Sequence, residues 1–158
     1  MRVLLCLEDI TQGVRADEQI RAQAALLDVT GEAIFVRDFS DRITYWNQGA
    51  QKIYGWSALE AQGKTTSELN LYADRATCLA PMQAVQRNNE WSGELNHRNR
   101  DGRELIMQSR WTLVRDGQGT PRGILVVGTD ITEKKRLESQ FYRSQRLESI
   151  GTLASGLG

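Results

Sequence analysis

Few side chains in this 158-residue sequence could do chemistry, and histidine sets the tightest limit. His97 is the only histidine, so a metal centre built from several histidines is excluded, and Ser–His or Cys–His catalysis would depend on this residue alone. It stands at the end of an expected strand, beside a turn and next to Arg98 and Arg100, which is typical of a solvated histidine. No nucleophile–base pair and no metal cluster can be assembled, and we expect no enzymatic activity from this chain.

The two cysteines form neither a metal-binding nor a redox motif. Cys6 and Cys78 are far apart in the sequence, so the close pairing that zinc and dithiol sites need is absent. Reduced thiols are typical of a cytoplasmic protein, which is the location we expect. The longest apolar run, residues 3–7, is much shorter than the roughly 20 residues of a spanning helix, so no membrane segment is predicted.

Composition and charge are those of an ordinary globular domain. Hydrophobic residues make up 40% of the chain and charged residues 25%, and 20 basic residues balance 20 acidic ones. With no net basic field to attract phosphates, nucleic-acid binding is not expected.

The elements that position these residues form a strand-rich middle region. Short strand-like runs separated by turn signals are predicted within residues 29–131: 33–37, 43–46, 94–98, 105–115 and 123–127. The last three are expected to form an antiparallel meander, because Asp–Gly turns separate them. The apolar residues of the longest strand share one parity, which predicts one buried face: Leu105, Met107, Trp111 and Leu113.

Helices are predicted between the second and third strands and at both ends. Asn47 can cap a helix over residues 49–54, and residues 73–88 carry apolar residues at helical spacing. Asp130 and Glu133 have the spacing of a capping box, so a final helix is expected to begin there. Four of its apolar residues recur at coiled-coil spacing and are expected to form a dimer seam: Leu147, Ile150, Ala154 and Leu157.

Residues 2–19 and 123–140 form an internal repeat. Each consists of an apolar strand, the triplet Asp-Ile-Thr and a charged helix. The repeat predicts a tandem array in which residues 1–11 are the remnant strand of an upstream unit and residues 12–28 are a linker helix. Asp130 and Thr132 lie where the last strand meets the final helix, so they could relay strain from the sheet to that helix; the alternative is a static helix cap.

Several motifs within residues 22–133 jointly resemble a PAS domain of the bacterial sensory-box type: Asn47, the Tyr54–Ser57 turn, Gly63, the Trp91–Glu94 strand start, the Arg-Asp-Gly hairpin and the terminal Asp-Ile-Thr. This resemblance implies an α+β fold for residues 29–131, with a five-stranded antiparallel sheet and short helices on one face enclosing a small cavity. The tail, residues 144–158, resembles the start of the dimerisation and phosphoacceptor helix of sensor histidine kinases. Residues 132–158 are therefore expected to be a signalling helix leading into a truncated phosphoacceptor domain.

The resemblance implies a sensory and dimerisation module of a two-component sensor histidine kinase. We expect a homodimer formed through the flanking helices, with an upstream PAS unit and downstream kinase domains as partners in the parent protein. The phosphoacceptor histidine and the ATP-binding domain are not in this chain, which is therefore not expected to be a kinase itself. Two alternatives stay open: a sensor that binds a small molecule or flavin, and a ligand-free structural spacer in the dimer.

The cofactor sites of known PAS domains do not match this sequence. Haem-binding members place their axial histidine on the long helix, but residues 73–90 contain none, and the Asn-Cys-Arg-Phe-Leu-Gln segment of photoactive members is absent, so Cys78 is expected to be a structural thiol. No cofactor is therefore expected, and Trp91 and Trp111 are interpreted as core residues. For a bound small molecule, strand parity and the family resemblance would select these pocket residues: Ile34, Val36, Tyr45, Met82, Trp91, Met107, Trp111 and Leu125.

Overall fold

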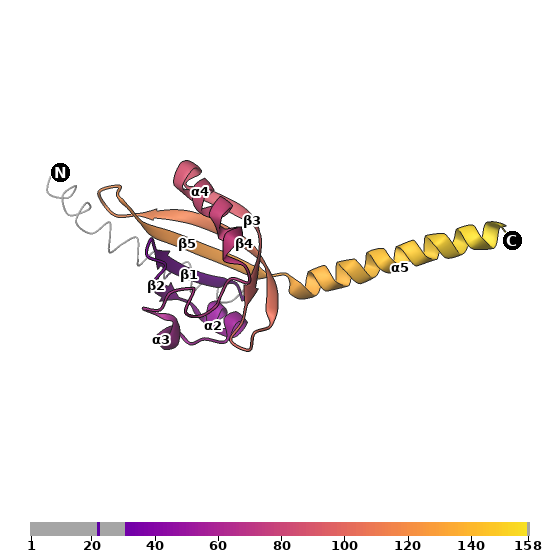
Figure 1. Cartoon of the computed structure of the whole chain (residues 1–158), viewed down its shortest axis with the longest axis horizontal. Helices are drawn as coiled ribbons and strands as arrows, with labels where there is room; N and C mark the ends of the chain where they lie inside the picture. The colour runs from indigo at the N-terminus through magenta and orange to yellow at the C-terminus, as the bar shows by residue number, and fades with distance from the viewer. Residues whose placement is uncertain (1–21, 23–30, 158) are drawn as a thin grey trace.

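Five antiparallel strands form one sheet in the order β2-β1-β5-β4-β3 (Figure 1). The computed structural model describes residue 22 and residues 31–157, with the side chains of residue 22 and residues 31–147. The strands are β1 (Ala33–Asp38), β2 (Ile43–Trp46), β3 (Glu90–Arg98), β4 (Glu104–Arg115) and β5 (Pro121–Asp130). The predicted α+β fold and the antiparallel meander of the last three strands are confirmed.

Short helices cover one face of the sheet, and a long helix leaves it (Figure 1). The helices are α2 (Gln48–Tyr54), α3 (Ala58–Ala61), the 3₁₀ helix η1 (Arg75–Cys78), α4 (Leu79–Asn88) and α5 (Thr132–Leu157). Helix α2 contacts β1, α3 contacts β2, and α4 contacts β3 and β4. Helix α5 follows β5 directly and extends away from the sheet, so its first turns are its connection to the domain.

Asn47 joins α2 to the sheet. Its side-chain oxygen accepts the N–H of Ala50, as predicted for a helix cap, and also the N–H of Ile34 on β1, both at 2.8 Å. Gly55 ends α2 in the left-handed region with φ of 81°, where glycine has no steric penalty. These two ends hold Tyr54 fully buried against the sheet.

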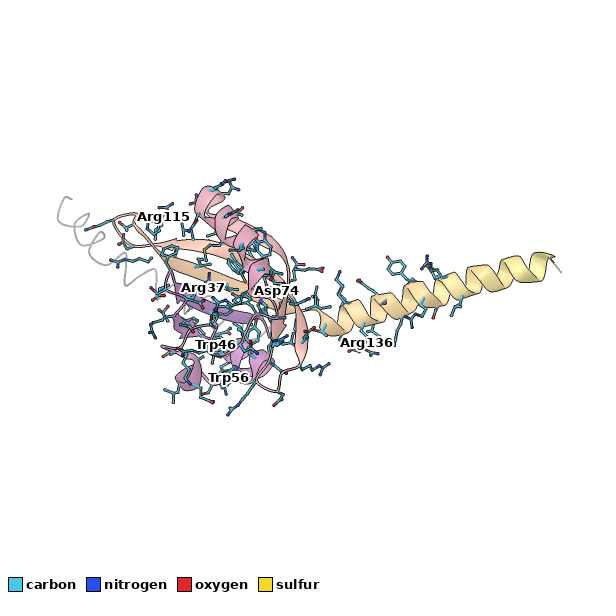
Figure 2. All side chains as sticks on the ribbon, in the orientation of Figure 1. Arg37, Trp46, Trp56, Asp74, Arg115 and Arg136 are labelled. Atoms are coloured by element: carbon cyan, nitrogen blue, oxygen red, sulfur yellow. The ribbon has the colours of Figure 1, made fainter. Side chains whose placement is uncertain are left out.

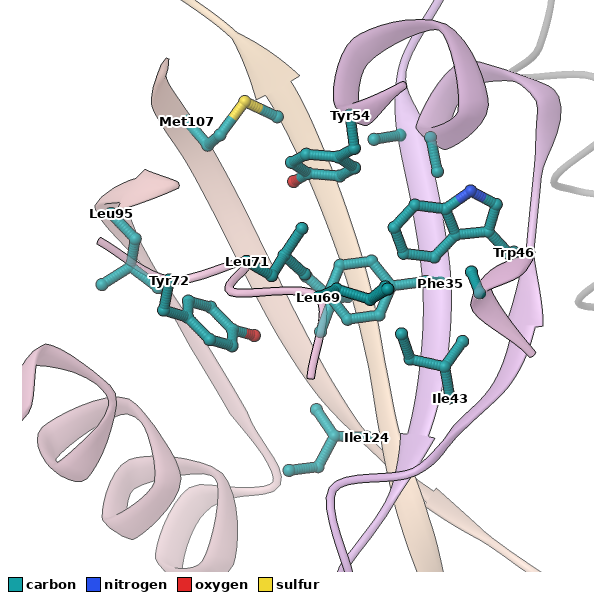
Figure 3. Close-up of a cluster of buried hydrophobic side chains, with 14 of the residues drawn as sticks. Phe35, Ile43, Trp46, Tyr54, Leu69, Leu71, Tyr72, Leu95, Met107 and Ile124 are labelled. Carbon is teal, nitrogen blue, oxygen red and sulfur yellow. The ribbon is translucent and has the colours of Figure 1, made fainter. Parts of the chain in front are cut away.

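The hydrophobic core lies between the sheet and the short helices (Figure 3). Phe35 is opposite both Trp46 and Val126 in the strand register, so these side chains share the helix-covered face. The predicted parity of the longest strand is confirmed, because Met107 and Trp111 are completely buried on this face.

Strand β3 begins at Glu90, four residues before its predicted start at residue 94. Gly93 interrupts the alternating pattern there, so the pattern alone starts the strand at residue 94, whereas the family motif already places a strand start at Trp91–Glu94. The Trp91 ring covers Gly93 so closely that an added Cβ atom would lie 2.5 Å from a ring carbon. The tryptophan thereby provides the apolar surface that the glycine lacks.

The predicted remnant strand, residues 1–11, lies outside the described part of the chain. The predicted linker helix, residues 12–28, lies outside it too, apart from residue 22, which is helical.

Candidate functional site

The junction between β5 and α5 is tied to the neighbouring strand β4 by a continuous hydrogen-bond network. The N–H of Ile106 donates to Thr132 Oγ1 at 2.9 Å, and the Thr132 hydroxyl donates to Asp130 Oδ1 at 2.5 Å. The N–H of Ile131 donates back to the carbonyl of Ile106 at 2.9 Å. Both polar groups of Ile106 are therefore bonded to the segment that starts α5.

Asp130 also accepts the N–H of Thr132, the first helical residue, at 3.0 Å, so it bonds the helix start from one residue before the N-cap position that the predicted capping box gives it. In a capping box the Glu133 side chain would in turn accept the backbone N–H of Asp130. The Glu133 carboxylate pairs with Arg136 on the next turn, and this pairing lowers the pKa of Glu133. Asp130 therefore shares its carboxylate between the helix start and the Thr132 hydroxyl.

A second contact ties α5 to the edge strand β3. Lys135 Nζ lies 2.9 Å from a carboxylate oxygen of Glu94, and this hydrogen bond raises the pKa of Lys135. Because Glu94 pairs with Gln108 on β4, the first turn of α5 is attached to two strands as well as to its own, β5.

Beyond its first turn, α5 presents large apolar side chains to solvent. Leu147, the first residue of the predicted dimer seam, is 64% exposed. Ile150, Ala154 and Leu157 lie within the helical span, but their side chains are outside the described part of the chain. Figure 2 shows this helix, with Arg136 labelled, extending away from the domain.

His97 is buried, which corrects the prediction of a solvated histidine. It lies on the same face of β3 as Leu95, and none of its surface is exposed. The backbone of residues 71–73 runs alongside this strand, and Tyr72 forms a β-bridge with His97. The Tyr72 ring meets the imidazole edge-on, with ring centroids 4.8 Å apart. The segment of residues 71–73 therefore covers His97, although the residues on either side of it in the sequence, Asn96 and Arg98, are polar.

The buried imidazole is held neutral. His97 Nδ1 shares a hydrogen bond of 2.6 Å with the Tyr54 hydroxyl, while its Nε2 atom has no protein partner. Burial lowers the pKa of His97 to about 3 and raises the pKa of Tyr54 well above its ordinary value. Neither group changes its charge near neutral pH, so the pair is a fixed polar contact in the core.

Arg37 is a second buried polar residue, and sequence reasoning missed it. Its guanidinium pairs with Asp41 at 2.6 Å and lies over the Trp111 ring, 5.2 Å from the centroid. Asp41 adopts a positive φ of 71° and also accepts the Thr66 hydroxyl at 2.5 Å. Figure 2 places Arg37 inside the domain. The one sequence signal for this burial is the position of Arg37, two residues after the core residue Phe35 on one strand.

The eight predicted pocket residues do not come together. Met107 and Trp111 are buried on the helix-covered face, and Met82 and Trp91 are partly buried against the same core. The other four alternate along their strands with core residues such as Phe35, Trp46 and Val126, so their side chains lie on the opposite face of the sheet. These four are Ile34, Val36, Tyr45 and Leu125. Any single pocket beneath the helices can include only the first four.

The parity of β1 is hard to assign from sequence. Its first four residues are all apolar, and Arg37, which would ordinarily mark the solvent side, is buried. Binding of a ligand to any of the eight stays a prediction.

Cys78 is partly buried at the end of η1, with a free thiol. Burial raises the pKa of this thiol, so the reactive thiolate is disfavoured. In the described part of the chain, no three metal-ligating side chains form a group that could hold an ion. None of the helices described there is long and apolar enough to cross a membrane.

The fold and its helical exit define the class of protein. A five-stranded antiparallel sheet, helices on one face and a helix leaving the last strand describe a sensory-box domain, as the motifs predicted. The family model of the PAS fold matches residues 23–131, and the chain belongs to the PAS family. No curated protein matches the chain in sequence.

Solved structures with the same fold include histidine kinase domains. The PAS domain of a protein from Colwellia psychrerythraea is 26% identical, with a TM-score of 0.64, and the match covers 72% of this chain and 97% of that one. A sensory box histidine kinase/response regulator from Burkholderia thailandensis is 23% identical, with a TM-score of 0.61, and the match covers 82% of this chain and 98% of that one.

A light-oxygen-voltage domain studied with a flavin analogue shares the fold at 20% identity. Its TM-score is 0.58, and the match covers 78% of this chain and 93% of that one. At this identity the likeness concerns the fold alone.

Proposed function

We propose that this chain is the sensory and dimerisation module of a two-component sensor histidine kinase, and that it relays a signal from the PAS sheet to α5 through the Asp130–Thr132 junction. The PAS family and the histidine kinase among the similar structures support the sensory role. The partners in this proposal are a second copy of the chain, an upstream PAS unit and downstream kinase domains.

One observation carries the relay. Ile106, which is bonded to the start of α5 through both its N–H and its carbonyl, is followed by Met107, whose side chain is completely buried in the core. Met107 is also the register partner of Asp130. Met107 is thus the neighbour in the chain of the residue that is bonded to the start of α5. A change in core packing that moves Met107 would also move Ile106 and, through its two hydrogen bonds, the start of the helix.

The signal would act by shifting an equilibrium between two packings of a helix pair. Each packing places the downstream helices of the two protomers differently, so one exposes and the other withholds the phosphoacceptor. The exposed Leu137, Phe141 and Leu147 provide apolar surface on α5 for such a pair. The sheet can shift this equilibrium if its contacts with the first turn of α5 are more favourable in one packing of the helix pair than in the other.

Replacing Asp130 tests the relay in the protein that carries this module. Asp130→Ala removes the acceptor for Thr132 and is expected to abolish the effect of the signal on autophosphorylation while the domain still folds. Asp130→Asn keeps an acceptor oxygen at the same place and is expected to retain most of the response. Circular dichroism of the isolated chain checks the fold of each variant. An unchanged response in the alanine variant would overturn the relay.

Sensing of a small molecule is the second candidate function, favoured by buried polar atoms that lack protein partners beneath α4. An absorption spectrum of the purified chain separates a bound flavin from a colourless ligand. A ligand-free spacer predicts neither a chromophore band nor any saturable binding.

A further inference from the structure

Helix α5 is attached to the domain only at its start. Ile131, Thr132 and Lys135 are partly buried, whereas every residue from 136 to 147 is exposed. The large apolar side chains in this exposed stretch are all more than half exposed, so none of them is packed into the sheet. The direction of α5 therefore depends on the polar contacts of its first turn.

Two of these contacts join α5 to different strands. Thr132 accepts the N–H of Ile106 on β4 at 2.9 Å. Three residues later, Lys135 Nζ lies 2.9 Å from a carboxylate oxygen of Glu94 on the edge strand β3. The first contact holds the start of the helix, and the second holds the next part of the turn toward β3. Without the second contact, a rigid helix can tilt away from β3 about its start.

A small tilt at this point produces a large movement at the far end of α5. The helix continues to Leu157, so at about 1.5 Å per residue the part beyond Lys135 is about 33 Å long. A tilt of about 10° would displace the far end by about 6 Å, close to the pitch of one helical turn. Figure 1 shows no other described element beside this part of the helix. The contact between Lys135 and Glu94 is therefore well placed to control where the C-terminal part of α5 lies.

Salt can weaken this contact because both side chains are accessible to solvent. The side chains of Lys135 and Glu94 are 41% and 44% exposed. Exposed ion pairs are weak, and dissolved ions screen them, since the Debye length falls from about 30 Å at 0.01 M salt to about 3 Å at 1 M. Gln108, the register partner of Glu94, is neutral. A second carboxylate that acts on Lys135, that of Glu138, belongs to α5 itself and cannot hold the helix to the sheet.

We propose that the Lys135–Glu94 ion pair is a salt-sensitive contact that holds α5 toward β3 and is released as the ionic strength rises. At low ionic strength α5 keeps one direction, and at high ionic strength it samples a wider range of tilt about Thr132. This inference rests on the proposed sensory function, for which it names ionic strength as a signal that acts on the helix without passing through the core.

The test measures the direction of α5 by double electron–electron resonance between two nitroxide labels on the full chain. The labels are attached through Leu59→Cys on α3, where the leucine is 92% exposed, and Ser144→Cys on the exposed part of α5. Cys6→Ser and Cys78→Ser remove the native thiols. An excess of unlabelled chain ensures that the measured distance lies within one chain. Samples in about 0.01 M and about 1 M sodium chloride are compared, because these concentrations differ about tenfold in Debye length.

We expect one narrow distance distribution at low salt and an additional broad component at high salt. The ratio of tilted to held helix is expected to rise about threefold, which is the range of an exposed ion pair. In Glu94→Gln and in Lys135→Gln, the broad component should be present at low salt and should no longer respond to salt. Lys135→Arg, which keeps the positive charge, should respond to salt as the wild type does.

Neighbouring charges provide matched controls. Lys134→Gln removes the same charge from the adjacent residue of α5, which is exposed. Glu90→Gln removes the same charge from β3, where Glu90 pairs with Arg110. Glu138→Gln removes the second carboxylate that acts on Lys135. All three variants should retain the salt response of the wild type.

Three outcomes would overturn the inference. The first is a distance distribution that does not change with salt in the wild type. The second is a salt response in Glu94→Gln equal to that of the wild type, which would assign the response to other charges. The third is a broad component in Lys135→Gln but not in Glu94→Gln, which would assign the effect of the lysine to α5 itself.

The distance is measured in the chain alone, so it is independent of the proposed kinase output. Autophosphorylation of the protein that carries this module, measured at both salt concentrations, tests that output separately. A salt-dependent distance with salt-independent autophosphorylation would support the contact and overturn ionic strength as a signal. If the distance does not depend on salt, the response of the Asp130→Ala variant still decides the relay.

Discussion

Thr132 Oγ1 accepts the backbone N–H of Ile106 at 2.9 Å, across 26 residues of sequence. The first residue of α5 is thereby bonded to a strand that is not its own neighbour in the chain. A helix cap formed within β5 and α5 alone would fix only the local backbone, whereas this bond fixes the direction of the helix relative to the sheet. Thr132 thus has a role that differs from that of an ordinary first-turn residue.

Replacing Thr132 by valine should loosen this junction. Valine has nearly the same shape but leaves the Ile106 N–H without an acceptor, so we expect the free energy of unfolding to fall by about 1–2 kcal/mol. Urea denaturation measures this loss, and the hydrogen exchange of the Ile106 amide should become faster. Thr132→Ser, which keeps the hydroxyl, is the matched control and should change both quantities much less. Equal exchange rates in the valine variant and the wild type would show that the bond does not form.

The single histidine gives the protein a predictable pH dependence. Burial lowers the pKa of His97 to about 3 in the folded chain, against an ordinary value of 6.5, so below about pH 6.5 the unfolded chain binds a proton that the folded chain does not. The contribution of neutral His97 to the free energy of unfolding is therefore fully present above about pH 6.5 and is lost as the pH falls below it. We expect a loss of about 2 kcal/mol between about pH 8 and about pH 5, measured by urea denaturation.

His97→Gln is the control for this pH dependence, because it keeps polar atoms in the core but cannot titrate. No other histidine is present in the chain, and carboxylates titrate mostly below this window. The glutamine variant should therefore be less stable than the wild type near pH 8, yet nearly constant in stability down to about pH 5. A wild-type slope that persists in this variant would assign the titration to another group.

Much of the fold could be predicted from the sequence where polar and apolar residues alternate. Strand β4 is the clearest example, because Gln108 and Arg110 separate its core residues Met107 and Trp111 and so reveal its parity. Strand β1 could not be read in this way. Arg37 is buried on this strand, so the usual rule that a charged residue marks the solvent face gives the wrong parity. The residues of β1 and its two partner strands that are predicted to line a pocket therefore lie on the face away from the helices.

The interior of the candidate site depends on contacts between distant segments. The burial of His97 requires the backbone of residues 71–73 to pair with β3, and nothing near His97 in the sequence signals that pairing. The junction differs, because Asp130 and Thr132 are adjacent to the strand end and their capping chemistry is local. Sequence reasoning therefore located the two polar residues of the junction but not the buried polar residues of the core.

The two buried tyrosines should respond in opposite ways to loss of the hydroxyl. Tyr54→Phe removes the partner of His97 Nδ1 and leaves that atom unpaired in the core, so we expect a loss of about 1–2 kcal/mol in the free energy of unfolding. Tyr72→Phe removes a hydroxyl without a protein partner, and the unligated chain should be as stable as the wild type or slightly more stable. Thermal and urea denaturation compare the pair. A large destabilisation by Tyr72→Phe would reveal a partner for this hydroxyl, such as bound water.

Dimerisation through α5 can be tested at Leu147, whose side chain is 64% exposed in the single chain. We expect the chain to sediment as a dimer, because a leucine at coiled-coil spacing buries its apolar surface only against a second helix. Leu147→Asp should shift the equilibrium to monomers, since burying a carboxylate in the seam is unfavourable. Leu59→Asp is the matched control: Leu59 on α3 is 92% exposed and lies outside the expected seam, so this variant should remain dimeric. If both variants sediment like the wild type, the dimer contact lies elsewhere than in this part of α5.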